Sequence, residues 1–200
     1  MYMRKALVVG INYYKHLRPL YGCVEDAKAV KSVLERNSDS DKSANFAVKL
    51  LSSIGPNDPV VKSELRENIR DLFFSDLETI LFYFSGHGDI ETTGGYLMAS
   101  DSETADEGVP LIDILAWANQ SPARNKIIVL DSCFSGIAGS CTSNPPVSEI
   151  KEGTTILTAS AANQYATEKN GHGVFTMLFV DALNGAASNL VGDITPGSIY

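Results

Sequence analysis

Short, mainly apolar segments alternate along the chain with segments in which apolar residues recur at helical spacing. The mainly apolar segments, at 6–12, 46–51, 79–87, 127–130 and 154–158, are typical of buried strands, and 127–130 is an unbroken apolar run of the kind that is buried on both faces. The helical spacing predicts helices over 24–36, 57–74, 110–119 and 175–183, the second of which opens at Asn57-Asp58-Pro59. Strands that alternate with helices favour a mainly parallel sheet with helices on both faces. The pattern therefore predicts an α/β fold.

Two of the predicted strands end in side chains that can perform chemistry. One apolar run leads into Asp131-Ser132-Cys133, and the run that starts at Thr79 leads into His87, which is flanked by two glycines. In open parallel sheets, ligands bind at the carboxyl ends of the strands. A single right-handed crossover between these two strands would bring the thiol and the imidazole into one cleft. The sequence thus predicts a cysteine–histidine dyad.

Such a dyad supports acyl transfer. A free thiol has a pKa of about 8.5, and a neighbouring imidazole can generate the thiolate and then protonate a leaving amine. The backbone N–H groups of Gly88 and Cys133 could stabilise a developing oxyanion, and this chemistry requires no cofactor. In the alternative interpretation, Cys133 is a buried structural thiol and His87 a loop residue. The chain lacks the GxSxG, GxGxxG and P-loop patterns.

Composition fits this picture and narrows the possible partners. The chain has 200 residues, enough for one domain over residues 1–200, and a formal net charge of −8 that argues against nucleic-acid binding. No apolar run approaches the roughly 20 residues of a membrane helix. Three cysteines without a secretion signal favour a cytoplasmic location.

Residues 193–200 look like the opening of another element, so we expect the N-terminal part of a longer protein, with a fused C-terminal domain or a regulatory partner.

Acidic residues are concentrated in the middle of the chain. Between Arg70 and Arg124 there is no Lys or Arg, and the span holds ten Asp and Glu residues. They are either a solvated acidic surface or the source of a field that attracts cationic substrates or a calcium ion. Six of them have suitable oxygen ligands but form no EF-hand loop, so no metal ligand can be assigned: Asp89, Glu91, Asp101, Glu103, Asp106 and Glu107.

Four motifs carry a resemblance to a known family. Ser85-Gly-His-Gly88, together with Asp131-Ser-Cys-Phe-Ser-Gly136, resembles the caspase-like cysteine peptidases (peptidase C14), and the metacaspase branch in particular. Tyr21-Gly-Cys-Val-Glu-Asp-Ala27 is similar to a Gly-Cys-x-x-Asp-Ala segment of metacaspases, and Thr158-Ala-Ser-Ala-Ala-Asn-Gln164 is similar to the end of one of their strands. The resemblance runs from about Lys5 to Phe179.

The resemblance implies a caspase-hemoglobinase sandwich and a dyad of His87 and Cys133, with an oxyanion site at Gly88 and Cys133. It also implies that Asp26 and Asp131 form the pocket for the residue before the scissile bond, lined by Ser160. Two carboxylates in a partly closed pocket are best neutralised by Arg or Lys. The alternatives are that Asp26 compensates the charge of a helix N-terminus, that Asp131 caps a turn and that Ser160 belongs to an ordinary turn.

By this resemblance the protein is a cysteine endopeptidase that cleaves proteins or peptides after Arg or Lys, as the proteolytic arm of a cell-death, stress or defence system. Some metacaspases are activated by Ca²⁺, and many caspase-like peptidases cut themselves in the loop after the nucleophile. A cut of that kind with basic specificity would follow Lys151, the single basic residue between Gly136 and Gly153. The other possible function is a catalytically silent binding or scaffold module with the same fold.

Overall fold

The computed structural model describes residues 3–37, 43–104, 107–134, 151–159, 168–169, 172–189 and 194–199. It describes the backbone alone at Cys133, Phe134, Glu168, Lys169, His172 and Pro196. The strands are β1 (Arg4–Ile11), β2 (Ala47–Ser53), β3 (Thr79–Glu91), β4 (Gly94–Leu97), β5 (Val109–Pro110), β6 (Asn125–Phe134), β7 (Thr154–Thr158), β8 (Glu168–Lys169) and β9 (His172–Gly173). The helices are α1 (Cys23–Glu35), α2 (Lys62–Phe73), α3 (Leu111–Gln120), α4 (Val174–Asp181), the π-helix η2 (Ala182–Ala186) and α5 (Pro196–Ile199).

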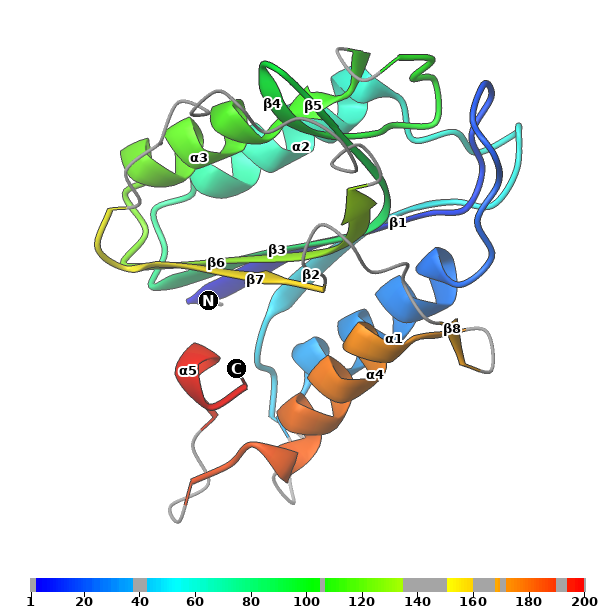
Figure 1. The fold of residues 1–200 in the computed structure, drawn as a ribbon. Coiled ribbons are helices and arrows are strands. Elements are labelled where there is room, and N and C mark those ends of the chain that lie inside the picture. Colours follow the sequence, from blue (N-terminus) through cyan, green and yellow to red (C-terminus); the bar gives the residue numbers. More distant parts are fainter. Residues whose placement is uncertain are drawn as a thin grey trace.

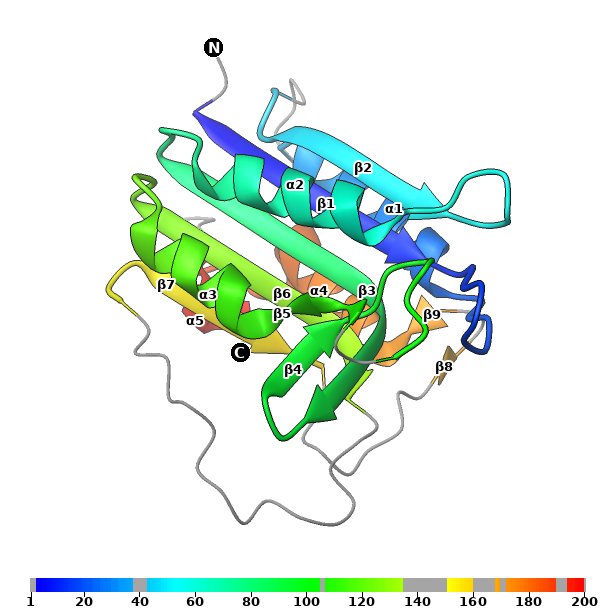
Figure 2. The ribbon, with the colours of Figure 1, turned by 90° about the horizontal axis from the view of Figure 1, so that it is seen from above.

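A parallel sheet forms the middle layer. Its five parallel strands lie in the order β2-β1-β3-β6-β7, with β3 at the centre. The antiparallel strands β4 and β5 extend the sheet from the carboxyl end of β3 (Figure 2). Helices α2 and α3 cover one face, and α1 and α4 cover the other (Figure 1). This arrangement confirms the predicted α/β fold with helices on both faces.

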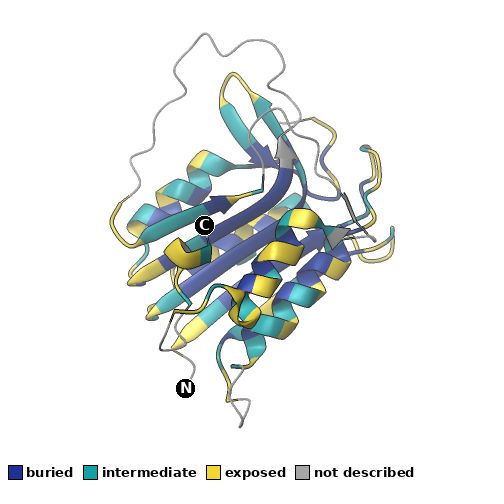
Figure 3. Cartoon of the chain, turned by 60° about the horizontal axis from the view of Figure 1, so that its bottom comes forward, coloured by how far each residue is buried: buried dark blue, intermediate teal, exposed yellow. Residues whose placement is uncertain are grey.

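The central strand is apolar from Ile80 to Phe84 because both of its faces are buried there. Phe82 and Phe84 point into the core under α2 and α3, whereas Leu81 and Tyr83 point into the core under α1 and α4. The buried interior follows the length of β3 and its neighbours (Figure 3). Alternation along a strand places successive side chains on opposite faces, so an unbroken apolar run is what such a strand requires.

Helix α1 lies unusually close to β1 at its first turn. A Cβ atom on Gly10 would lie 2.4 Å from the backbone oxygen of Cys23 and 2.7 Å from the Cβ of Ala27. Glycine at this position therefore permits the close approach that fixes the N-terminus of α1, and with it Asp26, beside the carboxyl ends of the strands.

The structure corrects two predicted boundaries. Helix α2 begins at Lys62, not at residue 57, because the carboxylate of Asp58 accepts the N–H groups of Ile54 and Gly55 and closes a turn before the helix. The strand that carries His87 does not end there: β3 continues to Glu91, because its last residues pair with β4. Among the described residues, no helix has the length and apolarity to cross a membrane.

Candidate active site

His87 and Cys133 occupy paired positions on neighbouring parallel strands. The register of β3 with β6 aligns His87 with Cys133, Ser85 with Asp131, and Gly88 with Phe134. Adjacent strands lie about 4.8 Å apart, so the backbones of the two dyad residues are direct neighbours. The predicted crossover between two neighbouring strands is thereby present, and both residues stand at the same edge of the sheet.

Three contacts fix the orientation of His87. Its N–H donates to the hydroxyl of Tyr14 at 2.8 Å, and the two rings lie 4.6 Å apart, inclined by 53°. Its Nε2 lies 2.7 Å from the carbonyl oxygen of Arg18. Because a carbonyl can only accept, Nε2 carries the proton, and in the neutral ring Nδ1 is then the acceptor. The histidine is therefore held in the tautomer that can take a proton at Nδ1.

Burial lowers the pKa of His87 below its ordinary value of 6.5, while the hydrogen bond to the Arg18 carbonyl and the charge of Asp89 partly oppose that shift. The neutral form is the one that can accept a proton from a thiol. At neutral pH the imidazole is consequently in the protonation state of a general base.

The two predicted pocket carboxylates converge on one glycine. Asp26, in the first turn of α1, accepts the N–H of Gly173 at 3.0 Å, and Asp131 lies near the end of β6. A Cβ atom on Gly173 would lie 2.8 Å from Oδ2 of Asp131 and 3.2 Å from Oδ2 of Asp26. Both carboxylates are buried, with exposed fractions of 2% for Asp26 and 8% for Asp131. The structure therefore brings the pair together, beside the strand position of the predicted nucleophile.

The environment of Asp131 opposes its ionisation. Burial raises its pKa from 3.8 to about 6, the negative charge of Asp26 adds to the rise, and a hydrogen bond from Thr176 lowers it in part. A buried acidic pair of this kind favours a cationic ligand, because a cation would stabilise both charges.

Comparison with known proteins shows the family of the chain. The family model of the caspase domain, peptidase C14, matches residues 3–195. This chain belongs to the caspase family of cysteine peptidases. It is 33% identical over 150 residues to metacaspase-1 of Plasmodium falciparum (isolate 3D7), and the match covers 66% of this chain and 24% of that protein. The chain thus matches about a quarter of the length of this metacaspase.

The caspase-family match confirms the family and the fold predicted from the motifs, but it does not assign individual residues. Ser160 lies outside the described residues, as do Cys141 and most of the loop after the nucleophile. Three residues that hold the site were not predicted. Tyr14 accepts the N–H of His87, Thr176 donates to Asp131, and Tyr83 is hydrogen-bonded to Thr176. Each of them is an ordinary apolar-face or loop residue in the sequence pattern, so no local signal marks it.

Some of the acidic residues after His87 bind backbone N–H groups. Asp101 accepts the N–H of Lys62 at the start of α2, and Glu107 accepts the N–H groups of Glu103 and Thr104. Asp106 lies outside the described residues. Within the described ranges, no three His, Cys, Asp or Glu side chains are grouped so that they could hold a metal ion.

Lys151 lies far from the dyad. Its N–H donates to Oδ1 of Asn119, and it precedes β7, whose first residue, Thr154, pairs with Lys126 at the beginning of β6. Cys133 is seven residues further along β6, roughly 23 Å away at about 3.3 Å per residue. A cut after Lys151 by the active site of the same chain would require this end of the sheet to rearrange.

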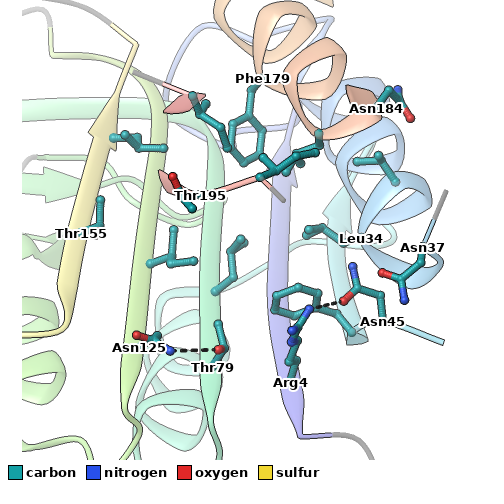
Figure 4. A pocket seen from close by; sticks show the side chains of 18 of the residues that line it. Arg4, Leu34, Asn37, Asn45, Thr79, Asn125, Thr155, Phe179, Asn184 and Thr195 are labelled. Carbon is teal, nitrogen blue, oxygen red and sulfur yellow. Dashed lines mark hydrogen bonds between the residues drawn. The ribbon is translucent and has the colours of Figure 1, made fainter. Parts of the chain in front are cut away.

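A large cavity among the described residues also lies away from the dyad. It has a volume of about 940 Å³ and opens between the amino ends of β1, β3, β6 and β7 and the helices α1 and α4, with Arg4, Thr79, Asn125 and Thr195 on its wall (Figure 4). None of its lining residues comes from the strand ends that carry His87 and Asp131. The chemistry of the side chains, and not the size of the cavity, identifies the site.

The raised pKa of Asp131 predicts a stability gain at neutral pH for Asp131→Asn. With a pKa of about 6 in the folded protein against 3.8 ordinarily, the wild type loses stability as pH rises from about 4 to about 6. The full difference between these two pKa values corresponds to about 3 kcal/mol in the free energy of unfolding. The asparagine can still accept the Thr176 hydroxyl but carries no charge.

Urea unfolding of both proteins at pH 4 and at pH 7 measures this effect. We expect the stability of Asp131→Asn relative to wild type to increase between the two pH values. Asp71→Asn, on the exposed side of α2, is the control for loss of a surface charge. An equal stability difference between Asp131→Asn and wild type at both pH values would contradict the raised pKa.

Proposed function

We propose that this chain is a cysteine endopeptidase in which His87 and Cys133 form the catalytic dyad and which cleaves after Arg or Lys. The observation that carries the proposal is the register of β3 and β6, which pairs His87 with Cys133. In the proposed reaction the Cys133 sulfur attacks the scissile carbonyl while Nδ1 of His87 takes the thiol proton. His87 then returns that proton to the leaving amine, and water releases the acyl group from sulfur.

Gly88 is the second donor of the proposed oxyanion site. The N–H of His87 donates to Tyr14 and its carbonyl accepts the N–H of Met98 at 3.0 Å, so the backbone N–H and C=O of His87 face away from β6. Successive residues of a strand alternate in direction, so the N–H of Gly88 faces β6. In the parallel ladder that pairs His87 with Cys133, this N–H points at the backbone of Cys133, so the proposal requires that it leave the ladder to bind an oxyanion.

Asp26 and Asp131 provide the proposed recognition of a basic side chain. Two buried carboxylates on either side of Gly173 match the charge of a guanidinium or an ammonium group. We propose that the substrates are proteins or peptides with Arg or Lys before the scissile bond. A role in cell death, stress or defence, and a cytoplasmic site of action, belong to the same proposal and follow from the metacaspase resemblance. Ca²⁺ activation stays a prediction without assigned ligands, and a calcium titration of rate and melting temperature tests it.

Fluorogenic peptides test the specificity. We expect efficient cleavage after Arg and Lys and none after Asp, because a third carboxylate beside Asp26 and Asp131 would be strongly repelled. Release of the fluorophore from peptides that are identical except for that residue measures the preference. Efficient cleavage after Asp would overturn the proposed pocket.

Substitution of the nucleophile tests the dyad and separates the enzyme from a silent scaffold module. Cys133→Ala should abolish cleavage and leave the circular dichroism spectrum and melting temperature close to wild type, since removal of one sulfur changes the volume little. Cys141→Ala is the matched control and should retain most activity. A wild-type protein that folds but cleaves no basic peptide would favour the scaffold function, and an active Cys133→Ala would exclude Cys133 as the nucleophile.

A further inference from the structure

A chain of two hydroxyl groups reaches Asp131 from the interior of the protein. Thr176, in the first turn of α4, donates to Oδ2 of Asp131 at 2.5 Å. The hydroxyl of Tyr83, on β3, lies 2.5 Å from the same threonine oxygen. The two hydroxyl residues are buried, with exposed fractions of 1% for Thr176 and 0% for Tyr83. These hydrogen bonds therefore join three elements, β3, α4 and β6, in a line that ends at one oxygen of Asp131.

The direction of these hydrogen bonds is fixed. Thr176 has one hydroxyl proton, and a carboxylate accepts it. The contact with Tyr83 must then be a donation from the tyrosine to the threonine. Both donors are thus aligned toward Asp131, and each hydrogen bond strengthens the next.

The hydroxyl chain holds one oxygen of Asp131 and opposes its protonation. Donation to a carboxylate favours the charged form, and here the hydrogen bond from Thr176 lowers the pKa of Asp131 against the effect of burial. Among the described residues, the hydrogen bond from Thr176 is the one found at this carboxylate, and it occupies Oδ2. No donor to Oδ1 is found within the described part of the chain.

We propose that Thr176 and Tyr83 are positioning residues for substrate specificity: their hydroxyls orient Asp131 so that it binds the cationic side chain before the scissile bond. This inference rests on the proposed function. Neither hydroxyl contacts the substrate, and their role is to hold the carboxylate in one direction. Their loss should weaken recognition of the positive charge more than it weakens peptide cleavage as such.

The test compares two peptides, one with Arg and one with citrulline before the scissile bond, on wild type, Thr176→Val and Thr176→Ser. Citrulline has the shape of arginine without its charge. We expect the ratio of kcat/KM for Arg over citrulline to fall about 10-fold in Thr176→Val, as for a lost hydrogen bond to a charged group. Thr176→Ser keeps the hydroxyl and should restore the ratio to within about twofold of wild type.

Thr154→Val is the matched control, because it removes a threonine hydroxyl that has no hydrogen-bond partner within the described residues. It should leave the ratio unchanged. Structural damage alone would lower kcat/KM for both peptides equally, so an unchanged ratio in Thr176→Val overturns the inference.

If Thr176→Val does not fold, Tyr83→Phe decides the matter, since it removes the second hydroxyl and keeps the ring. A fall of about twofold or more in the ratio of kcat/KM for Arg over citrulline supports the inference, and a smaller change or none overturns it. A wild-type enzyme that cleaves but shows no preference for Arg over citrulline contradicts the proposed specificity. A wild type with that preference, together with an unchanged ratio in the variants, contradicts the positioning role alone.

Discussion

The pairing of β3 with β6 is the constraint on which the candidate site depends. A parallel ladder that runs from Thr79 and Asn125 to Gly88 and Phe134 leaves no freedom in which residues are neighbours. A slip of one residue would turn every side chain of β6 to the other face and would take Asp131 away from Thr176. The packing of specific side chains on both faces therefore fixes the register, and the register sets His87 against Cys133. The core and the chemistry are in this sense specified by the same residues.

The strand register serves both the stability of the core and the candidate site, whereas the acidic pair of Asp26 and Asp131 serves the candidate site at a cost in stability. Two buried carboxylates near Gly173 disfavour the folded state at neutral pH, and nothing in the packing of the core requires them. The N–H of Gly173 and the hydroxyl of Thr176 offset part of this cost. Both donors come from the start of α4, whose positive end also favours nearby negative charge. The helix thus compensates a local instability that a purely structural site would not contain.

The sequence was sufficient for the fold and for the placement of His87 and Cys133 at neighbouring strand ends, because both depend on local signals. An apolar run marks a buried strand, and the residues that follow it mark the active edge of a parallel sheet. The contacts of Tyr83 with Thr176, and of Thr176 with Asp131, join residues 93 and 45 positions apart, and neither periodicity nor composition encodes such pairings. The start of α2 was misplaced for a related reason. Asp58 resembles a helix cap in sequence, but its carboxylate binds the preceding turn.

The position of Asp131 two residues before Cys133 has a geometric consequence for any ligand of the site. Both residues belong to β6, where alternate residues are separated by about 6.6 Å along the strand. Since one strand joins them, the separation between the proposed charge-binding position and the proposed reacting position does not adapt to the substrate. In the proposed site, a basic side chain must therefore have a certain minimum length to reach the carboxylate while its own carbonyl lies at the sulfur. Cations on short side chains would fail on length alone, whatever their charge.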